Sequence, residues 1–300
     1  MIGLSTHKPW QAALLFAASS GLLAACSHDW DVYLPPGGTA SGSGGNGAAG
    51  GANSGGWGGA PVITGKCPQS DPGAPTLVTI PTPEHYAMCI GESEVTRGQY
   101  ATWLDTAPSA PAGMPAACAS VASYTPTASW PPGGIALDSP VAFVNWCDAY
   151  AFCLAHGQRL CGKIGPAGGN VDFSSSNVPG VSEWFNACTN AGSSTYPYGA
   201  SYVADRCDGL DYGANKAVTV KSLAECRGRA AVFDLSGNVW EWEDSCEPGD
   251  AGSPLGDQCR QRGGAYNGPQ EDLQCQSSSQ TGRGLAYATL GFRCCANPLP

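Results

Sequence analysis

Residues 233–242, FDLSGNVWEW, form the stretch from which the fold of this chain is most readily inferred. The stretch places Asp234 and Glu241 seven residues apart, with the backbone carbonyls of Gly237 and Val239 between them. Calcium takes carboxylate and carbonyl oxygens in irregular geometry, so these four residues are a candidate calcium site. Alternatively, the stretch serves packing: its two tryptophans enter the core and its carboxylates form local hydrogen bonds. The residues alone leave both interpretations open.

Cysteines lie on both sides of this stretch. The chain of 300 residues holds 15 cysteines, and one of them, Cys26, stands apart near the N-terminus. The other fourteen (15 less one) are an even set, which in an exported protein predicts up to seven disulfides. No C-x-x-C motif occurs, and only three histidines follow Cys26, so a zinc cluster is not expected.

The N-terminus has the pattern of a bacterial lipoprotein. Residues 1–25 read as a signal peptide, with a basic start at Lys8 and an apolar run too short to span a bilayer. The run ends in LAAC, residues 23–26, which is typical of a lipobox, so Cys26 is the expected lipidation site. Ser27 then favours the outer membrane as the place of anchoring. The alternative is an ordinary secreted protein with a chance cysteine near its cleavage site.

A sharp change of composition divides the mature chain. Residues 26–66 are rich in Gly, Ala and Ser and are expected to be a flexible tether, whereas residues 67–300 have the composition of one sizeable domain. Acidic residues outnumber basic ones, 24 to 14, which argues against nucleic acid as a partner. The only membrane contact that the sequence predicts is the lipid anchor.

Regular secondary structure is expected to be sparse in this domain. A capping-box pattern begins at Thr96 and predicts a helix with Tyr100, Trp103 and Leu104 on one face. A second helix is expected from Asn145 to Gly157. Its apolar face is expected to consist of Trp146, Tyr150, Cys153 and Leu154. Leu77 to Ile80 reads as a strand, and the sequence as a whole predicts an irregular α+β domain held by disulfides.

Several segments, read in chain order, resemble motifs of the formylglycine-generating enzyme family, also called sulfatase-modifying factor domains. The stretch at 233–242 is the strongest, since it is close to the family's YDMSGNVWEW. The others are YAMCIGESEVT at 86–96, PVAFVNWCDAYAFC at 140–153, GQRL at 157–160, EW at 183–184, YPYG at 196–199, RGG at 262–264 and LGFRC at 290–294. The resemblance covers residues 67–300.

This resemblance implies an irregular, loop-rich α+β fold related to C-type lectins, with calcium on the residues that match Asp234, Gly237, Val239 and Glu241. It also implies two disulfides, Cys153–Cys294 and Cys188–Cys275. Ten cysteines fall outside that pattern. Proximity in sequence suggests Cys207–Cys226 and Cys246–Cys259 among them, and Cys161–Cys295 is a looser suggestion.

The catalytic cysteines of the family have no counterpart in this chain. In active members, a cysteine pair soon after the RGGS motif binds Cu(I), activates O2 and oxidises a cysteine of a sulfatase to formylglycine. The matching positions are Gly268 and Leu273, which cannot bind a metal through their side chains or shuttle a thiol. Cys275 lies where the structural cysteine is expected. No catalytic residue and no copper are therefore expected.

Other candidate residues have two interpretations each. Glu94 and Glu183 invite an acid/base role, but single carboxylates of this kind more often cap helices or pair with an arginine such as Arg159. Four tyrosines line a binding surface or serve packing: Tyr86, Tyr196, Tyr198 and Tyr212. For the whole protein, the first hypothesis is a lipoprotein whose domain binds a protein, peptide or glycan of the cell envelope. The second is an active formylglycine-generating oxidase, and the missing cysteine pair favours the first.

Overall fold

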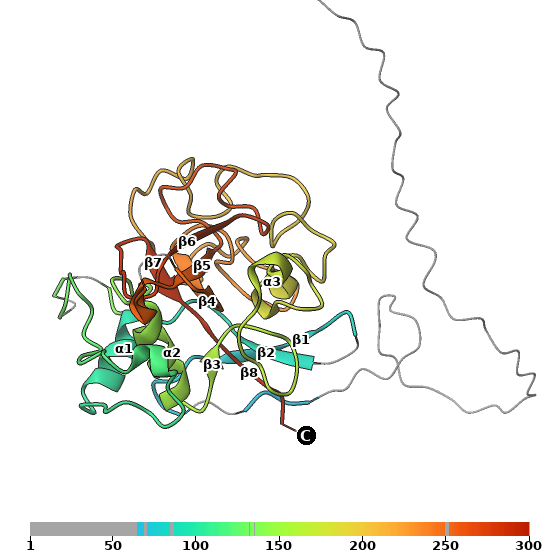
Figure 1. The fold of residues 1–300 in the computed structure, drawn as a ribbon. Coiled ribbons are helices and arrows are strands. Elements are labelled where there is room, and N and C mark those ends of the chain that lie inside the picture. Colours follow the sequence, from blue (N-terminus) through green and yellow to red (C-terminus); the bar gives the residue numbers. More distant parts are fainter. Residues whose placement is uncertain are drawn as a thin grey trace, which may run out of the picture. The chain divides into compact units, whose positions relative to one another are not determined.

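The computed structural model describes residues 65–68, 71–84, 87–131, 133–134, 136–249 and 252–299, drawn in colour in Figure 1. The expected signal peptide, the lipidation site Cys26 and the tether up to residue 64 lie outside the described residues, as does Tyr86. Within the described part of the chain, no helix has the length and apolar character needed to cross a membrane.

One four-stranded sheet joins the beginning of the domain to its end. Its order is β1 (Leu77–Pro81), β2 (Ala87–Gly91), β8 (Cys294–Ala296) and β3 (Arg159–Leu160), with every neighbouring pair antiparallel. The C-terminal strand β8 lies between β2 and β3. The sequence-based strand at Leu77 to Ile80 is confirmed as β1.

The second sheet contains the end of the 233–242 stretch. Its order is β6 (Ser278–Gly282), β5 (Gln258–Arg262), β4 (Trp240–Glu247) and β7 (Leu290–Phe292), which are the orange and red strands in Figure 1. β4 pairs with β5 antiparallel and with β7 parallel. β4 thus holds the 233–242 stretch against the segment of residues 290–294.

Three short α-helices begin at side-chain caps. Thr96 and Gln99 form the expected capping box at the start of α1 (Arg97–Leu104). Asn145 caps α2 (Trp146–Ala155), and Gly157, with a φ of 67°, follows its end, as expected for a helix stop. The sequence did not predict α3 (Glu183–Cys188), because six residues are too few to show a helical period. Short 3-10 turns lie at Ala116–Cys118, Phe173–Ser175 and Pro254–Gly256.

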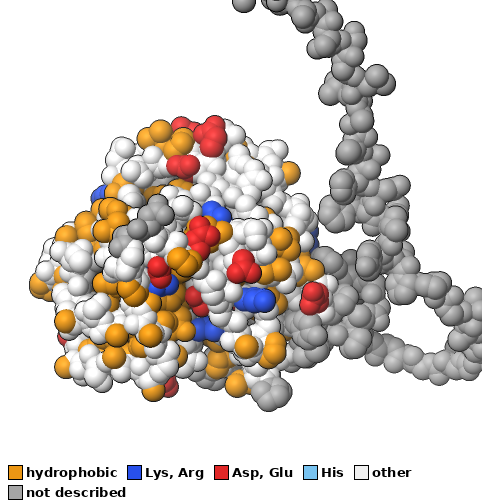
Figure 2. All heavy atoms as spheres, in the orientation of Figure 1, with side chains coloured by type: hydrophobic (Ala, Val, Ile, Leu, Met, Phe, Trp, Pro, Cys, Tyr) orange, Lys and Arg blue, Asp and Glu red, His pale blue; other side chains and the backbone are white. Residues whose placement is uncertain are grey.

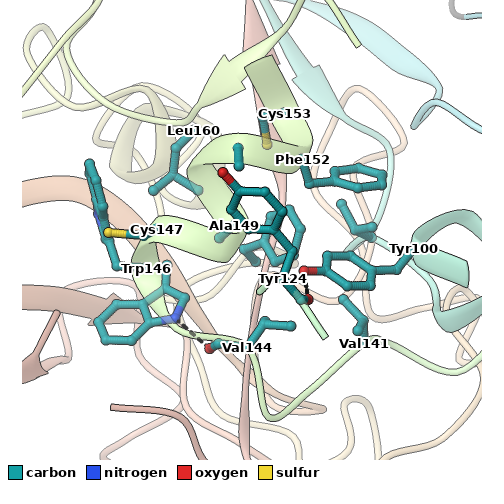
Figure 3. Close-up of a cluster of buried hydrophobic side chains, with 14 of the residues drawn as sticks. Tyr100, Tyr124, Val141, Val144, Trp146, Cys147, Ala149, Phe152, Cys153 and Leu160 are labelled. Carbon is teal, nitrogen blue, oxygen red and sulfur yellow. Dashed lines mark hydrogen bonds between the residues drawn. The ribbon is translucent and has the colours of Figure 1, made fainter. Parts of the chain in front are cut away.

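An aromatic cluster packs α1 and α2 together (Figure 3). Tyr100 stacks on Phe152 with ring centroids 5.4 Å apart, and its hydroxyl donates to the Tyr124 carbonyl at 2.7 Å. The prediction of a single apolar face on α2 was too narrow, because Ala149, Ala151 and Phe152 are also fully buried. Of the predicted face, Trp146 and Cys153 are buried, whereas Tyr150 and Leu154 are half-buried.

Every cysteine from Cys67 onward forms a disulfide. Both pairs that the family resemblance implies, Cys153–Cys294 and Cys188–Cys275, are present. The three pairs suggested by sequence are present too: Cys161–Cys295, Cys207–Cys226 and Cys246–Cys259. The remaining two pairs, Cys67–Cys89 and Cys118–Cys147, were not predicted. The adjacent Cys294 and Cys295 join two different partners, as expected.

Candidate functional site

The 233–242 stretch forms a tight loop before it enters β4. Asp234, Gly237 and Asn238 all have positive φ, at 59°, 75° and 60°. A Cβ atom at Gly237 would lie 2.1 Å from the Asp208 carbonyl oxygen, so only glycine fits there. The Asn238 N–H donates to that same oxygen at 2.7 Å, which fixes the loop against the segment around Asp208.

Glu241, one of the candidate calcium ligands, forms a buried ion pair with Arg293. The Arg293 Nε and Nη2 atoms donate to its two oxygens at 2.6 and 2.5 Å, and Trp184 Nε1 donates to Oε2 at 2.8 Å. Arg293 also donates to the carbonyl oxygens of Gly91 and Phe233, both at 2.9 Å. This pair therefore ties the C-terminal segment to β2, α3 and the loop.

Two further carboxylates lie beside this pair. Glu94 is 1% exposed, and neither of its oxygens meets hydrogen-bond geometry with a described residue. Burial, and then the charges of Asp234 and Glu241, raise the pKa of Glu94 well above its usual value. Burial also raises the pKa of Asp234 to about 6, although the Lys221 N–H that donates to its Oδ2 at 2.7 Å opposes the shift. Burial and the neighbouring negative charges therefore favour the protonated form of Glu94.

The four candidate calcium ligands do not fit a calcium ion in this arrangement. No described residue donates a hydrogen bond to the carbonyl oxygens of Gly237 or Val239, so these two atoms stay available. Both oxygens of Glu241, however, are bound to Arg293, whose positive charge would repel a cation. Among the described residues, no group of three or more His, Cys, Asp or Glu could hold a metal ion. The contacts of Glu241 therefore agree with the packing interpretation. Calcium binding remains a prediction that rests on the family resemblance.

The two positions that hold catalytic cysteines in the active family are closed. Leu273 is 1% exposed and packs in a cluster with Tyr196, Cys207 and Cys226. Gly268 is buried, and its carbonyl accepts from the Leu210 N–H at 2.9 Å. The segment around residues 207–210 thus covers both positions. Since all cysteines in the described part of the chain are disulfide-bonded, that part offers no free thiol.

The remaining candidates are mostly structural. Glu183 accepts hydrogen bonds from both Nη atoms of Arg159 and from the Gly162 N–H at 3.0 Å, which confirms pairing with arginine. Tyr196 is buried and stacks on Tyr198 with centroids 5.4 Å apart, so these two serve packing. Tyr212 is exposed.

The surface itself gives little guidance. Figure 2 shows one face of the domain, on which apolar side chains are scattered and charged side chains of both signs are intermixed. A cleft of about 700 Å³ is a better candidate binding site. Its lining includes Arg97, Phe143, Lys216 and Tyr266. The cleft could not be predicted from the sequence, because these residues come from four distant segments that share no motif.

Comparisons with known proteins agree with the fold. A sequence model of the Sulfatase-modifying factor enzyme 1-like domain matches residues 71–298. The chain is 27% identical to the formylglycine-generating enzyme of Bos taurus over 195 residues, which cover 54% of this chain and 45% of the bovine protein. The matched part thus spans less than half of that relative.

Solved structures show the same likeness. The crystal structure of CarF matches with a TM-score of 0.52 at 18% identity, covering 76% of this chain and 100% of CarF. PvdO from Pseudomonas aeruginosa matches with a TM-score of 0.48 at 14% identity, covering 75% of this chain and 92% of PvdO. At such identities the CarF match bears on the fold alone. It supports the irregular α+β fold described above.

Proposed function

Because this chain belongs to the sulfatase-modifying factor family, we propose that it keeps the family's fold as a binding or accessory module without the thiol chemistry of formylglycine generation. The observation that carries this proposal is the pair Gly268 and Leu273. Oxidation of a peptide cysteine by copper and O2 needs soft ligands for Cu(I), and thiolates are the usual ones. These two positions offer none.

The surroundings of the two positions support the same proposal. Gly209 packs on Leu273, since a Cβ atom on Gly209 would lie 2.5 Å from Leu273 Cδ2. Cys275, the nearest thiol in sequence, is bonded to Cys188. A shifted cysteine pair therefore has no free member in the described part of the chain.

We place the module in the cell envelope. The lipobox at residues 23–26 would give Cys26 a lipid anchor, and residues 26–66 would tether the domain at a membrane surface, with outer-membrane sorting favoured by Ser27. Seven disulfides suit an oxidising, exported location. The partner would be a protein, peptide or glycan of the envelope.

The alternative function is an active formylglycine-generating oxidase. An assay for enzymatic conversion of a peptide substrate distinguishes it from the proposed binding module. The purified chain is incubated with copper, O2 and a peptide that carries the Cys-x-Pro-x-Arg motif of sulfatases. The bovine enzyme serves as the positive control, and a peptide with serine in place of the cysteine as the negative one. Conversion of the peptide cysteine to an aldehyde would overturn the proposal.

A further inference from the structure

Arg97 differs from the other buried arginines of this domain. Four arginines of the described chain are buried, and three of them have a carboxylate partner: Arg262 with Glu243, Arg283 with Asp257 and Arg293 with Glu241. Arg97 is 4% exposed and belongs to none of the ion pairs among the described residues. Burial of a cation without a counter-ion is costly, so this site calls for an anion.

The protein satisfies Arg97 only in part. Its Nη2 donates to the Ser129 carbonyl, and its guanidinium lies 5.5 Å from the centre of the Trp130 ring. Nη1 donates to no described residue. Burial lowers the pKa of Arg97, and no carboxylate contributes to that shift. Arg97 is also the first residue of α1, where the helix dipole disfavours a positive charge. Each of these effects would be relieved by an anion.

Arg97 lines the cleft of about 700 Å³, which contains no acidic side chain in its lining. A second cation, Lys216, is exposed there and forms no ion pair with a described residue. The chain as a whole carries a formal charge of −10, so a cleft with two cations and no carboxylate is unlike its average surface. The neighbouring cleft, by contrast, has Glu92 and Asp138 in its lining.

The uncharged lining suits a ligand rich in hydroxyl groups. Four hydroxyl side chains form no hydrogen bond with a described residue: Ser129, Ser139, Thr219 and Ser222. Hydroxyls donate and accept, so they complement sugar hydroxyls. The rings of Phe143 and Tyr266 add apolar faces on which a sugar ring can pack. An acidic peptide is the alternative occupant, and the titration described below distinguishes the two.

We propose that this cleft binds an acidic oligosaccharide, with a carboxylate of the sugar on the guanidinium of Arg97 and with Lys216 as the second cationic contact. The inference deepens the proposed binding function and rests on it, since it names the ligand class of the module. A guanidinium can bind a carboxylate through two N–H groups in one plane, which an ammonium group cannot do, so this position suits an arginine.

The test is calorimetric titration of the purified full chain with three probes: a tetrasaccharide of uronic acids, a neutral tetrasaccharide of the same length, and tetra-glutamate. The uronic acid probe should bind at least about 10-fold more tightly than either of the others, and added salt should weaken it. Equal affinity for the neutral probe, equal or tighter binding of tetra-glutamate, or no binding at millimolar concentration would overturn the proposal.

Variants locate the site. Arg97→Gln should weaken uronic acid binding about 10- to 100-fold, and Arg97→Lys, which keeps the charge but loses the planar fork, should weaken it less. Lys216→Gln should weaken it about 2- to 5-fold, whereas Lys163→Gln, at an exposed lysine outside the cleft, should have no effect. If Arg97→Gln fails to fold, Arg97→Lys and Lys216→Gln decide the question, and unchanged affinity in both would overturn the site. Aldehyde formation in the peptide assay would contradict the proposed function but would leave this binding measurement interpretable.

Discussion

Arg293 donates to both carboxylate oxygens of Glu241, at 2.6 and 2.5 Å, and both side chains are at most 1% exposed. Glu241 belongs to FDLSGNVWEW and Arg293 to LGFRC, two of the segments that resemble motifs of the family. Their pairing gives a structural reason for the two motifs to occur in one domain. The buried carboxylate of one motif is neutralised by the buried guanidinium of the other.

Removal of Arg293 should therefore destabilise the domain strongly. Arg293→Gln leaves Glu241 buried without its counter-ion, and we expect a loss of about 3–5 kcal/mol in the free energy of unfolding. Arg97→Gln is the matched control, because it removes a buried arginine that has no carboxylate partner, and it should cost less than about 2 kcal/mol. Urea unfolding measures both. A larger loss for Arg97→Gln than for Arg293→Gln would contradict this account of the pair.

A buried carboxyl in α2 should make stability depend on pH. Burial raises the pKa of Asp148 from 3.8 to about 7, and the hydrogen bonds from Asn145 oppose the shift. A carboxyl whose pKa is raised in the folded state holds its proton more tightly there than in the unfolded chain. Its contribution to stability is therefore full below about pH 4 and is lost as pH rises to about 7.

Asp148→Asn isolates this effect, because the amide keeps an oxygen that can accept from the Asn145 N–H at the start of α2. Relative to the wild type, the variant should gain stability between pH 4 and pH 7, by on the order of 1–3 kcal/mol. Unfolding free energies at several pH values would show it. A difference between the two proteins that stays constant with pH would mean that Asp148 does not titrate in this range.

The disulfides should differ in their contribution to stability according to the loops that they close. Cys153–Cys294 spans 141 residues and Cys246–Cys259 spans 13. Chain entropy alone assigns about 5 kcal/mol to the first and about 3 kcal/mol to the second. The paired alanine variants, one pair at a time, should follow that order in thermal unfolding. Equal losses would indicate that native contacts, rather than loop closure, set the contribution.

Calcium offers a direct check of the loop at residues 234–241. Since Glu241 is bound to Arg293, we expect millimolar calcium, or its removal by a chelator, to leave the melting temperature unchanged. A calcium-dependent rise that disappears in Asp234→Ala would place a calcium ion at this loop and contradict the expectation. Magnesium at the same concentration controls for ionic strength.

Lipidation is tested in cells. The wild-type chain should incorporate labelled fatty acid and sediment with membranes, whereas Cys26→Ser should do neither. Cys67→Ser, which alters a disulfide cysteine of the domain, is the control for a general effect of losing a cysteine. Membrane retention of the Cys26→Ser variant would contradict the lipobox interpretation.

Local features of this fold could be predicted from sequence, and contacts between distant segments could not. Thr96 and Asn145 predict the start of a helix, because each forms a cap with a residue three positions further along the chain. Cys207 and Cys226 pair across 19 residues, which proximity suggests. The family resemblance supplied the two long-range disulfides.

The features that were missed depend on tertiary structure. Nothing near Glu241 in sequence shows that Arg293 occupies its oxygens, so the loop read equally well as a calcium site. From the sequence alone, Arg97 would be taken for an exposed residue at the start of a helix. Only the structure shows that it is buried and has no carboxylate partner among the described residues. In both cases the role of a charged side chain depends on its neighbours in the folded structure, and these neighbours are distant in sequence.

Mass spectrometry of the Cys-x-Pro-x-Arg peptide tests whether this domain keeps the fold of the family without its thiol chemistry. After incubation with the purified chain, copper and O2, we expect the peptide cysteine to remain a thiol, while the bovine enzyme converts it. Detection of the formylglycine aldehyde with this chain, absent for the serine peptide, would show that the domain has thiol-oxidising activity and would contradict the proposed function.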